Sequence, residues 1–199
     1  MSTSGCAVFR DLLRERLRGI AELSDTQAEA LEAHYNLLVK WNRTLNLTAI
    51  RDEEEAVERH YCESIFLAAH LPAGPLRVAD VGSGAGFPGL PAAVFRPECQ
   101  VTLIESHQRK AVFLKEAARG LPNARVLARR AEEVAERCDV AISRAVSYKD
   151  LTPSLKTLAP AAVLLTGSDE PPREMGFEWE PAVALPWGKQ RWLRRGRRS

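Results

Sequence analysis

The chain has 199 residues, of which 45% are hydrophobic and 27% are charged, and its formal net charge is only +2. These values are typical of a globular protein with one or two domains, and they exclude a bulk polycation. No apolar run approaches the roughly 18 residues that cross a bilayer, and charges interrupt the opening segment MSTSGCAVFRDLLRERLRGI, unlike a signal peptide. We therefore expect a cytoplasmic protein with no membrane partner.

Four cysteines are scattered along the chain, and no two have the Cys-x-x-Cys spacing of a zinc site; they are Cys6, Cys62, Cys99 and Cys138. Because nothing in the sequence pairs them, we interpret them as small buried hydrophobic residues. The sequence therefore predicts no metal site.

Helical patterns occupy residues 1–74, which we predict to form a helical N-terminal cap. The first helix should place its apolar residues on one side, namely Val8, Phe9, Leu12, Leu13, Leu17 and Ile20. Ser24 and Gln27 have the spacing of a capping box, so a second helix begins there and ends around WNRTLNLTAI. Asp52 and Glu55 repeat that signature and open a third helix, which runs to about Leu71.

Residues 75–199 show a different pattern, in which short apolar strands alternate with helices. The strand-like segments are LRVADVG, QVTLIE, ARVLA, DVAIS and AAVLLTG, and the helical ones are FPGLPAAVF, HQRKAVFLKEAARG, AEEVAER and YKDLTPSLKTL. This alternation predicts an α/β domain whose parallel sheet, of about six strands, carries helices on both faces. No helix separates GFEWEPAVALP from KQRWLRR, so the chain should end in an antiparallel hairpin.

The stretch VADVGSGAGFPGLP predicts a nucleotide site directly after the first strand. Glycines at this place let the backbone turn sharply and let a ligand approach the main chain, as at Gly82 and Gly84. The spacing G-x-G-x-x-G leaves a nicotinamide oxidoreductase open as an alternative. Asp80 would repel a pyrophosphate, however, and Pro88 and Pro91 remove N–H groups that would hold one.

S-adenosylmethionine fits these residues better, because it carries a sulfonium and an ammonium group and no phosphate. Asp80 suits such a cationic end. Glu105 closes the second strand, where an acid can accept hydrogen bonds from ribose hydroxyls. After the third strand, the Ala131 N–H and the Glu132 side chain are placed to contact the adenine. In this order, at successive strand ends, the residues predict a Rossmann-like methyltransferase.

The segment after the fourth strand narrows the choice of methyl acceptor. This segment, ISRAV, lacks the (N/D)PP(Y/F) motif of many amine methylases, and no cysteine lies in the Pro-Cys setting of C5 pyrimidine methylases. Guanine N7 has a free lone pair and needs no general base, which fits both absences. A small-molecule acceptor stays open, as does a non-catalytic RNA-binding module that has kept a cofactor fold.

Five segments in order, WNRTLNLTAI, RHYCESI, DVGSGAGFPGLP, RAEEV and ISRAV, resemble the bacterial RsmG family, also called glucose-inhibited division protein B. The resemblance covers roughly residues 30–167. It implies a cytoplasmic enzyme that uses S-adenosylmethionine to methylate N7 of the guanine at position 527 of 16S rRNA. It further implies that the partner is 16S rRNA, in the 30S subunit or its precursor. We expect no DNA partner and a monomer.

The resemblance also assigns roles to single residues. It implies that Gly82 and Phe87 line the cofactor loop and that Ala131 and Glu132 hold the adenine. Arg144 then lies beside the cofactor and the acceptor, and Asn46 and His60 face the active site from the cap. The chain departs from the family at Glu105 and Glu63, where Asp is common, and at Thr166-Gly167, where Lys-Gly is common.

Basic side chains suggest where RNA could bind. The last nine residues, RWLRRGRRS, include five arginines and no acid. Together with Lys40, Arg43, Arg51, Arg59, Lys149 and Lys156, these arginines could contact RNA phosphates near the strand ends, or they could form an ordinary solvated surface.

Overall fold

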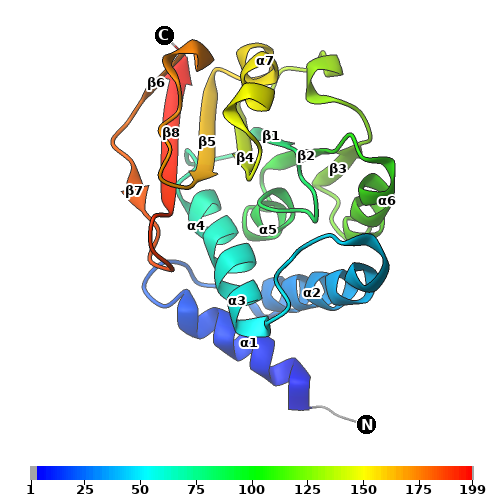
Figure 1. Cartoon of the computed structure of the whole chain (residues 1–199). Coiled ribbons are helices and arrows are strands. Elements are labelled where there is room, and N and C mark those ends of the chain that lie inside the picture. The colour runs from blue at the N-terminus through cyan, green and yellow to red at the C-terminus, as the bar shows by residue number, and fades with distance from the viewer. Residues whose placement is uncertain (1–3, 199) are drawn as a thin grey trace.

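A computed structural model of the chain describes residues 4–198, with side chains from residue 8 onward. Its N-terminal part is helical. Helices α1 (Ser4–Arg16) and α2 (Asp25–Leu45) lie against one longer helix (Figure 1). That longer helix consists of α3 (Glu53–Ala56), the π-helical segment η1 (Val57–Cys62) and α4 (Glu63–Ala69).

The expected helix signals are present, with two differences. The Ser24 hydroxyl accepts from the Gln27 N–H at 3.2 Å and the Gln27 side chain accepts from the Ser24 N–H at 3.0 Å, so the first capping box is confirmed. At the second, the Asp52 carboxylate accepts from the Glu55 N–H at 2.8 Å, but the Glu55 side chain binds Arg59 instead of returning the bond. On α1, Val8 is 54% exposed, so the buried side of that helix is narrower than predicted.

The rest of the chain forms one sheet with strand order β3-β2-β1-β4-β5-β8-β6 (Figure 1). Its five parallel strands are β1 (Arg77–Val81), β2 (Gln100–Ile104), β3 (Ala124–Leu127), β4 (Val140–Arg144) and β5 (Ala161–Thr166). The expected number of about six parallel strands was therefore too high by one.

An antiparallel C-terminal hairpin is confirmed. It consists of β6 (Phe177–Trp179), the short β7 (Val183–Ala184) and β8 (Trp192–Arg198). Strand β8 inserts between β5 and β6 and runs antiparallel to both, which extends the parallel sheet with reversed strands. A 3-10 turn, η3 (Arg173–Met175), precedes it.

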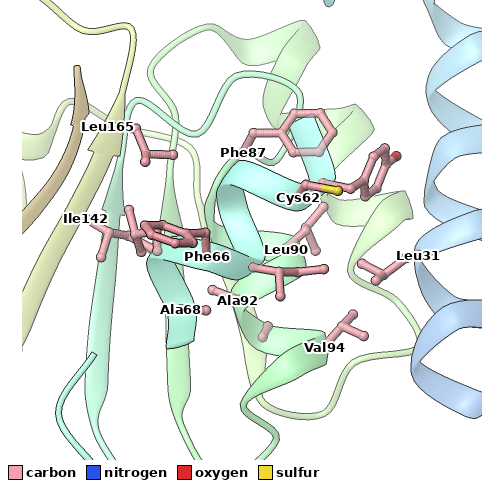
Figure 2. Packing of buried hydrophobic residues seen from close by; sticks show 14 of the residues in the cluster. Leu31, Cys62, Phe66, Ala68, Phe87, Leu90, Ala92, Val94, Ile142 and Leu165 are labelled. Atoms are coloured by element: carbon pink, nitrogen blue, oxygen red, sulfur yellow. The ribbon is translucent and has the colours of Figure 1, made fainter. Parts of the chain in front are cut away.

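Helices cover both faces of the sheet, as predicted. Neighbouring strand residues point to opposite faces, so Val140 and Ile142 belong to one cluster and Ala141 to the other. The first face holds the cap together with α5 (Gly89–Phe95) and α6 (Gln108–Ala117), and the second holds α7 (Tyr148–Leu158). Figure 2 shows Phe66, Phe87 and Leu90 in the first cluster together with Ile142 and Leu165 of the strands.

The first hydrophobic cluster runs without a break from the cap into the sheet, since it joins Phe9 and Leu31 to Val78 and Leu103. The division of the chain at residues 74 and 75 stays a prediction. The segment AEEVAER was expected to be a helix and is not: only a 3-10 turn, η2 (Ala131–Glu133), forms, and no regular structure follows it until β4. Its single buried apolar residue, Val134, gives no helical face to pack.

The predicted burial of the cysteines is confirmed for Cys62, Cys99 and Cys138, which are free thiols, and the Cys6 side chain lies outside the described residues. Within residues 4–198, no helix is both long and apolar enough to span a membrane.

Candidate functional site

The glycine loop after β1 is held in a tight conformation. Gly82, Gly84 and Gly86 have positive φ angles of 73°, 56° and 94°, which side chains rarely allow. The Gly82 and Ser83 N–H groups both donate to the Ile104 carbonyl, at 3.0 and 3.1 Å. A Cβ on Gly82 would lie 2.5 Å from Val146 Cγ2, whereas one on Gly84 would meet nothing nearer than 3.9 Å. The loop is therefore closed on one side and open over Gly84.

Asp80 lies beneath this loop, and the expectation that it addresses the cationic end of a ligand was wrong. Its side chain is 0% exposed, and its Oδ2 accepts from the Gly89 N–H at 3.0 Å. Oδ1 is buried without a hydrogen-bond partner. Burial raises the pKa of Asp80 to about 7. Asp80 thus fixes the start of α5 against β1 and does not face a ligand.

The start of α5 offers no ordinary phosphate site. Gly89 N–H donates to Asp80, Leu90 N–H donates to the Gly86 carbonyl at 2.7 Å, and Pro91 has no N–H. A pyrophosphate would find the donors of this helix end already used. The Gly89 and Leu90 N–H groups are therefore not free to bind a phosphate.

Glu105 joins the ends of β1 and β2. Its Oε2 accepts from the Gly84 N–H at 2.9 Å, and its Oε1 accepts from the His107 N–H at 2.7 Å. The carboxylate is 8% exposed, and each oxygen keeps a second lone pair for another donor. Ala131 and Glu132 follow β3 in the turn η2, with Glu132 exposed. These positions fit a ribose and an adenine at successive strand ends.

His60 and Arg144 meet where the cap reaches the end of β4. The π-helical segment η1, a distortion frequent at functional sites, carries His60. The Arg144 guanidinium donates to His60 Nδ1 at 2.8 Å and also to the Arg59 carbonyl. Phe87 stacks on His60 with 4.5 Å between ring centroids, and the Arg144 guanidinium lies 5.1 Å from the Phe87 ring centroid. Three residues predicted to line one site are thus in contact.

Asn46 does not join this cluster. It ends α2 in the left-handed conformation, with φ of 41°, and its side chain is exposed. Its predicted role toward the acceptor stays a prediction. The amide that does act here is Asn42, one turn earlier, which binds the backbone of Thr48, and Thr48 in turn binds His60. The segment WNRTLNLTAI contains both residues, but its spacing alone does not show which of its polar side chains is buried.

A second link from the cap holds the glycine loop itself. His34 of α2 donates through Nε2–H to the Ala85 carbonyl at 3.0 Å, and the Tyr61 hydroxyl donates to His34 Nδ1 at 3.0 Å. Burial lowers the pKa of His34 to about 4, so the ring is neutral at pH 7. No local sequence signal marks these residues, because the contact crosses 51 positions of the chain.

A cavity of about 450 Å³ opens beside Arg144 at the ends of β4 and β5. Its lining includes Val146, Tyr148, Thr166 and Arg191, and a second cavity, of about 590 Å³, adjoins it through Gly167 and Arg191. The Thr166 hydroxyl accepts from Arg194 Nε at 3.1 Å. Val146 in the lining of the first cavity also lies against Gly82, so this cavity borders the glycine loop.

Most arginines of the C-terminal segment are used inside the protein. Arg191 binds the fully buried Glu63 of α4, and Arg194 is buried against Thr166. Arg195 pairs with Glu180 at 2.7 Å, and Arg198 donates to the last carbonyls of α7. The alternative in which this segment contacts RNA phosphates stays a prediction, and its exposed arginines are Arg197 and Arg198.

Comparison with known proteins gives the family. Residues 27–161 match the family model described as rRNA small subunit methyltransferase G. A protein of Neisseria meningitidis named ribosomal RNA small subunit methyltransferase G is 46% identical over 140 residues, which cover 66% of this chain and 67% of that protein. Its namesake from Chromobacterium violaceum is 45% identical over 140 residues, covering 68% of this chain and 66% of that protein.

Solved structures show the same fold at low identity. A SAM-dependent methyltransferase from Aquifex aeolicus superposes with a TM-score of 0.57 at 18% identity, covering 71% of this chain and 92% of that chain. The magnesium protoporphyrin IX methyltransferase of Synechocystis, solved with bound SAM, gives 0.55 at 11% identity and covers 100% and 99%. The predicted Rossmann-like methyltransferase fold is thereby confirmed. Because the family model covers more than half of the chain, from α2 to the start of β5, this chain belongs to the rRNA small-subunit methyltransferase G family.

Proposed function

We propose that this protein transfers a methyl group from S-adenosylmethionine to N7 of guanine 527 in 16S rRNA. The observation that carries the proposal is the family match over residues 27–161, which includes both the glycine loop and the His60–Arg144 cluster. The used donors at the start of α5 support a cofactor without phosphate and disfavour the nicotinamide alternative.

One set of residues binds the cofactor, and another positions the methyl acceptor. Gly82 and Gly84 present backbone to the methionine part of the cofactor, Glu105 accepts from the ribose, and Ala131 and Glu132 address the adenine. When bound, S-adenosylmethionine supplies a methyl group on a sulfonium, which is a good leaving group. These residues would hold the cofactor so that its methyl group could be transferred to the lone pair of guanine N7, with the sulfonium sulfur as the leaving group.

No residue has to remove a proton, because guanine N7 carries none. The geometry agrees, since burial and the neighbouring Arg144 lower the pKa of His60 to about 2. A base held in that state is a poor proton acceptor at neutral pH. Rate enhancement then comes from holding N7 in line with the methyl group, and Arg144 grips the guanine O6 or a phosphate. An arginine on N7 itself would oppose the positive charge of the product.

The direct test uses methyl-labelled S-adenosylmethionine and 30S particles from a strain that lacks this activity. We expect label in 7-methylguanosine after digestion of the 16S rRNA. Particles from a strain that has the activity are the matched control, because their guanine is already modified and should take up no label. Label in another nucleoside, or cofactor binding without transfer to any RNA, would contradict the proposal and favour another acceptor or the non-catalytic RNA-binding alternative.

The finer description of the partner belongs to the same proposal. The substrate is the 16S rRNA within the 30S subunit or its precursor, met in the cytoplasm by a monomer of this chain. Methylation measured on naked rRNA, precursor particles and finished subunits separates the three substrates by rate.

RNA phosphates should contact basic side chains that have no acidic partner in the described part of the chain. Lys40 and Arg43 on α2, Arg51 before α3 and Lys149 on α7 meet this condition, and all four are exposed. Each phosphate contact that is lost lowers the slope of log K against log salt by about 0.7–0.9. Replacing all four by glutamine should therefore reduce the slope by roughly 3 and weaken binding at low salt.

Lys115 and Arg119 provide the matched control for that measurement. They are exposed at and just beyond the end of α6, at the opposite edge of the sheet from the glycine loop. Their replacement by glutamine should leave the salt slope unchanged. Equal slopes for the two variant proteins, measured by filter binding of 30S particles, would contradict the proposed RNA surface.

A further inference from the structure

A chain of hydrogen bonds runs from the cap to Arg144. Thr48 Oγ1 and His60 Nε2 are 2.8 Å apart, and His60 Nδ1 and Arg144 are 2.8 Å apart. Thr48 follows the end of α2, His60 lies in η1, and Arg144 ends β4. Three elements that are separate in the sequence thus meet through one imidazole ring.

The partners fix which nitrogen of His60 carries its hydrogen. A guanidinium can only donate, so Nδ1 must accept from Arg144. Burial and the charge of Arg144 lower the pKa of His60 to about 2, so the ring is neutral and its one hydrogen is on Nε2. Nε2–H therefore donates to Thr48 Oγ1.

Thr48 is itself held so that its hydroxyl oxygen stays in place. Asn42 donates through Nδ2 to the Thr48 carbonyl at 2.9 Å and accepts from the Thr48 N–H at 3.0 Å. The Ile50 N–H donates to Thr48 Oγ1 at 3.1 Å. With two hydrogen bonds accepted, Oγ1 has both lone pairs engaged and offers His60 a fixed acceptor.

At the other end of the chain of bonds, the guanidinium of Arg144 is oriented from three sides. His60 Nδ1 and the Arg59 carbonyl each accept one of its hydrogens, and the Phe87 ring lies 5.1 Å away. Arg144 has five N–H groups, so three remain for a ligand. Arg144 also lines the cavity of about 450 Å³ at the ends of β4 and β5.

We infer that Thr48 and His60 are positioning residues, which aim Arg144 at the acceptor nucleotide through a fixed histidine tautomer. The donating guanidinium of Arg144 fixes the Nε2–H tautomer, Thr48 Oγ1 accepts that hydrogen and holds the ring in place, and the Nδ1 lone pair then sets the plane of the guanidinium. This inference rests on the proposed function for the identity of the acceptor, an RNA nucleotide, but not for the geometry.

The kinetic test compares three threonine variants. Thr48→Val keeps the shape and removes the acceptor, so KM for 30S particles should rise about 10-fold, while the Kd for S-adenosylmethionine changes less than about twofold. Thr48→Ser restores the hydroxyl and should stay within about twofold of the original KM. Thr44→Val removes a hydroxyl that binds only the Trp41 carbonyl of the same helix, and it should change nothing. An unchanged KM in Thr48→Val, or equal KM values for the Ser and Val variants, would overturn the inference.

The spectroscopic test needs no RNA. Two-bond ¹H–¹⁵N correlation spectra, with His60 assigned by its absence in His60→Gln, should show Nδ1 unprotonated and Nε2 protonated between pH 6 and 8. A His60 protonated on Nδ1 would overturn the inference even if methylation is observed. If the protein shows the expected tautomer but methylates no RNA, the proposed function is refuted. The hydrogen-bonded arrangement of Thr48, His60 and Arg144 is then still supported.

Discussion

Arg144→Ala should lower kcat/KM for methylation of 30S particles on the order of 100-fold. The Arg144 guanidinium lines the cavity at the ends of β4 and β5, and a good contact of an arginine to a base is worth about 1–3 kcal/mol. The loss should appear mainly in the KM for 30S particles and in kcat, because the Arg144 guanidinium bonds to the cap and not to the glycine loop. The Kd for S-adenosylmethionine should therefore change about threefold or less.

Two further variants make this measurement specific. Arg144→Lys keeps the charge but cannot donate in the fixed directions of a guanidinium, so it should recover only part of the activity. Arg119→Ala removes an exposed arginine just beyond the end of α6, away from the proposed RNA surface, and should leave kcat/KM unchanged. If Arg144→Ala alters neither methyl transfer nor cofactor affinity, Arg144 has no role at the acceptor.

Asp80 should make the protein less stable as the pH rises from 4 to 7. The pKa of this carboxyl is raised from 3.8 to about 7 in the folded protein, because its ionised form is buried with one oxygen unpartnered. Between these two values the folded state holds a proton that the unfolded state has released. The free energy of unfolding therefore falls with pH in this window, by as much as about 4 kcal/mol, and is level above it.

Asp80→Asn should abolish this slope, because the amide does not titrate. Urea unfolding at pH 5, 6, 7 and 8 measures the free energy of unfolding of both proteins. As the pH rises, the Asn variant should become more stable relative to the original protein. Asp139→Asn is the matched control. Arg77 lowers the pKa of Asp139, so that group titrates below this range and its removal should leave the slope as it is. Parallel stability curves for the original protein and Asp80→Asn would refute the assignment.

Much of the site could be predicted because a parallel sheet turns chain order into spatial order. Each parallel strand presents its carboxyl end to the same edge, so Gly82 after β1, Glu105 after β2 and Arg144 at the end of β4 were expected to lie close together. The tight turn at the glycines could also be predicted, since positive φ angles are accessible mainly to glycine. The cofactor end of the site is thus specified by local motifs and their order.

The same local reasoning failed where burial decides. Asp80 was expected to face a ligand, but the helix that packs over it makes its carboxylate a support for Gly89. The C-terminal arginines look like a basic run in the sequence, but β8 inserts between β5 and β6 and places Arg194 and Arg195 against acceptors of the fold. Charge along a chain does not show which side chains a sheet will cover.

The sequence by itself therefore determined the helical cap, the α/β fold, the glycine loop and the family, because these depend on periodicity and on residues close together in the chain. Only the tertiary structure decided that Thr48, His60 and Arg144 form one chain of hydrogen bonds and that His34 binds the glycine loop at the Ala85 carbonyl. Those bonds join residues up to 84 positions apart. They exist because the cap packs on one face of the sheet, and a pattern in either segment alone does not specify that contact.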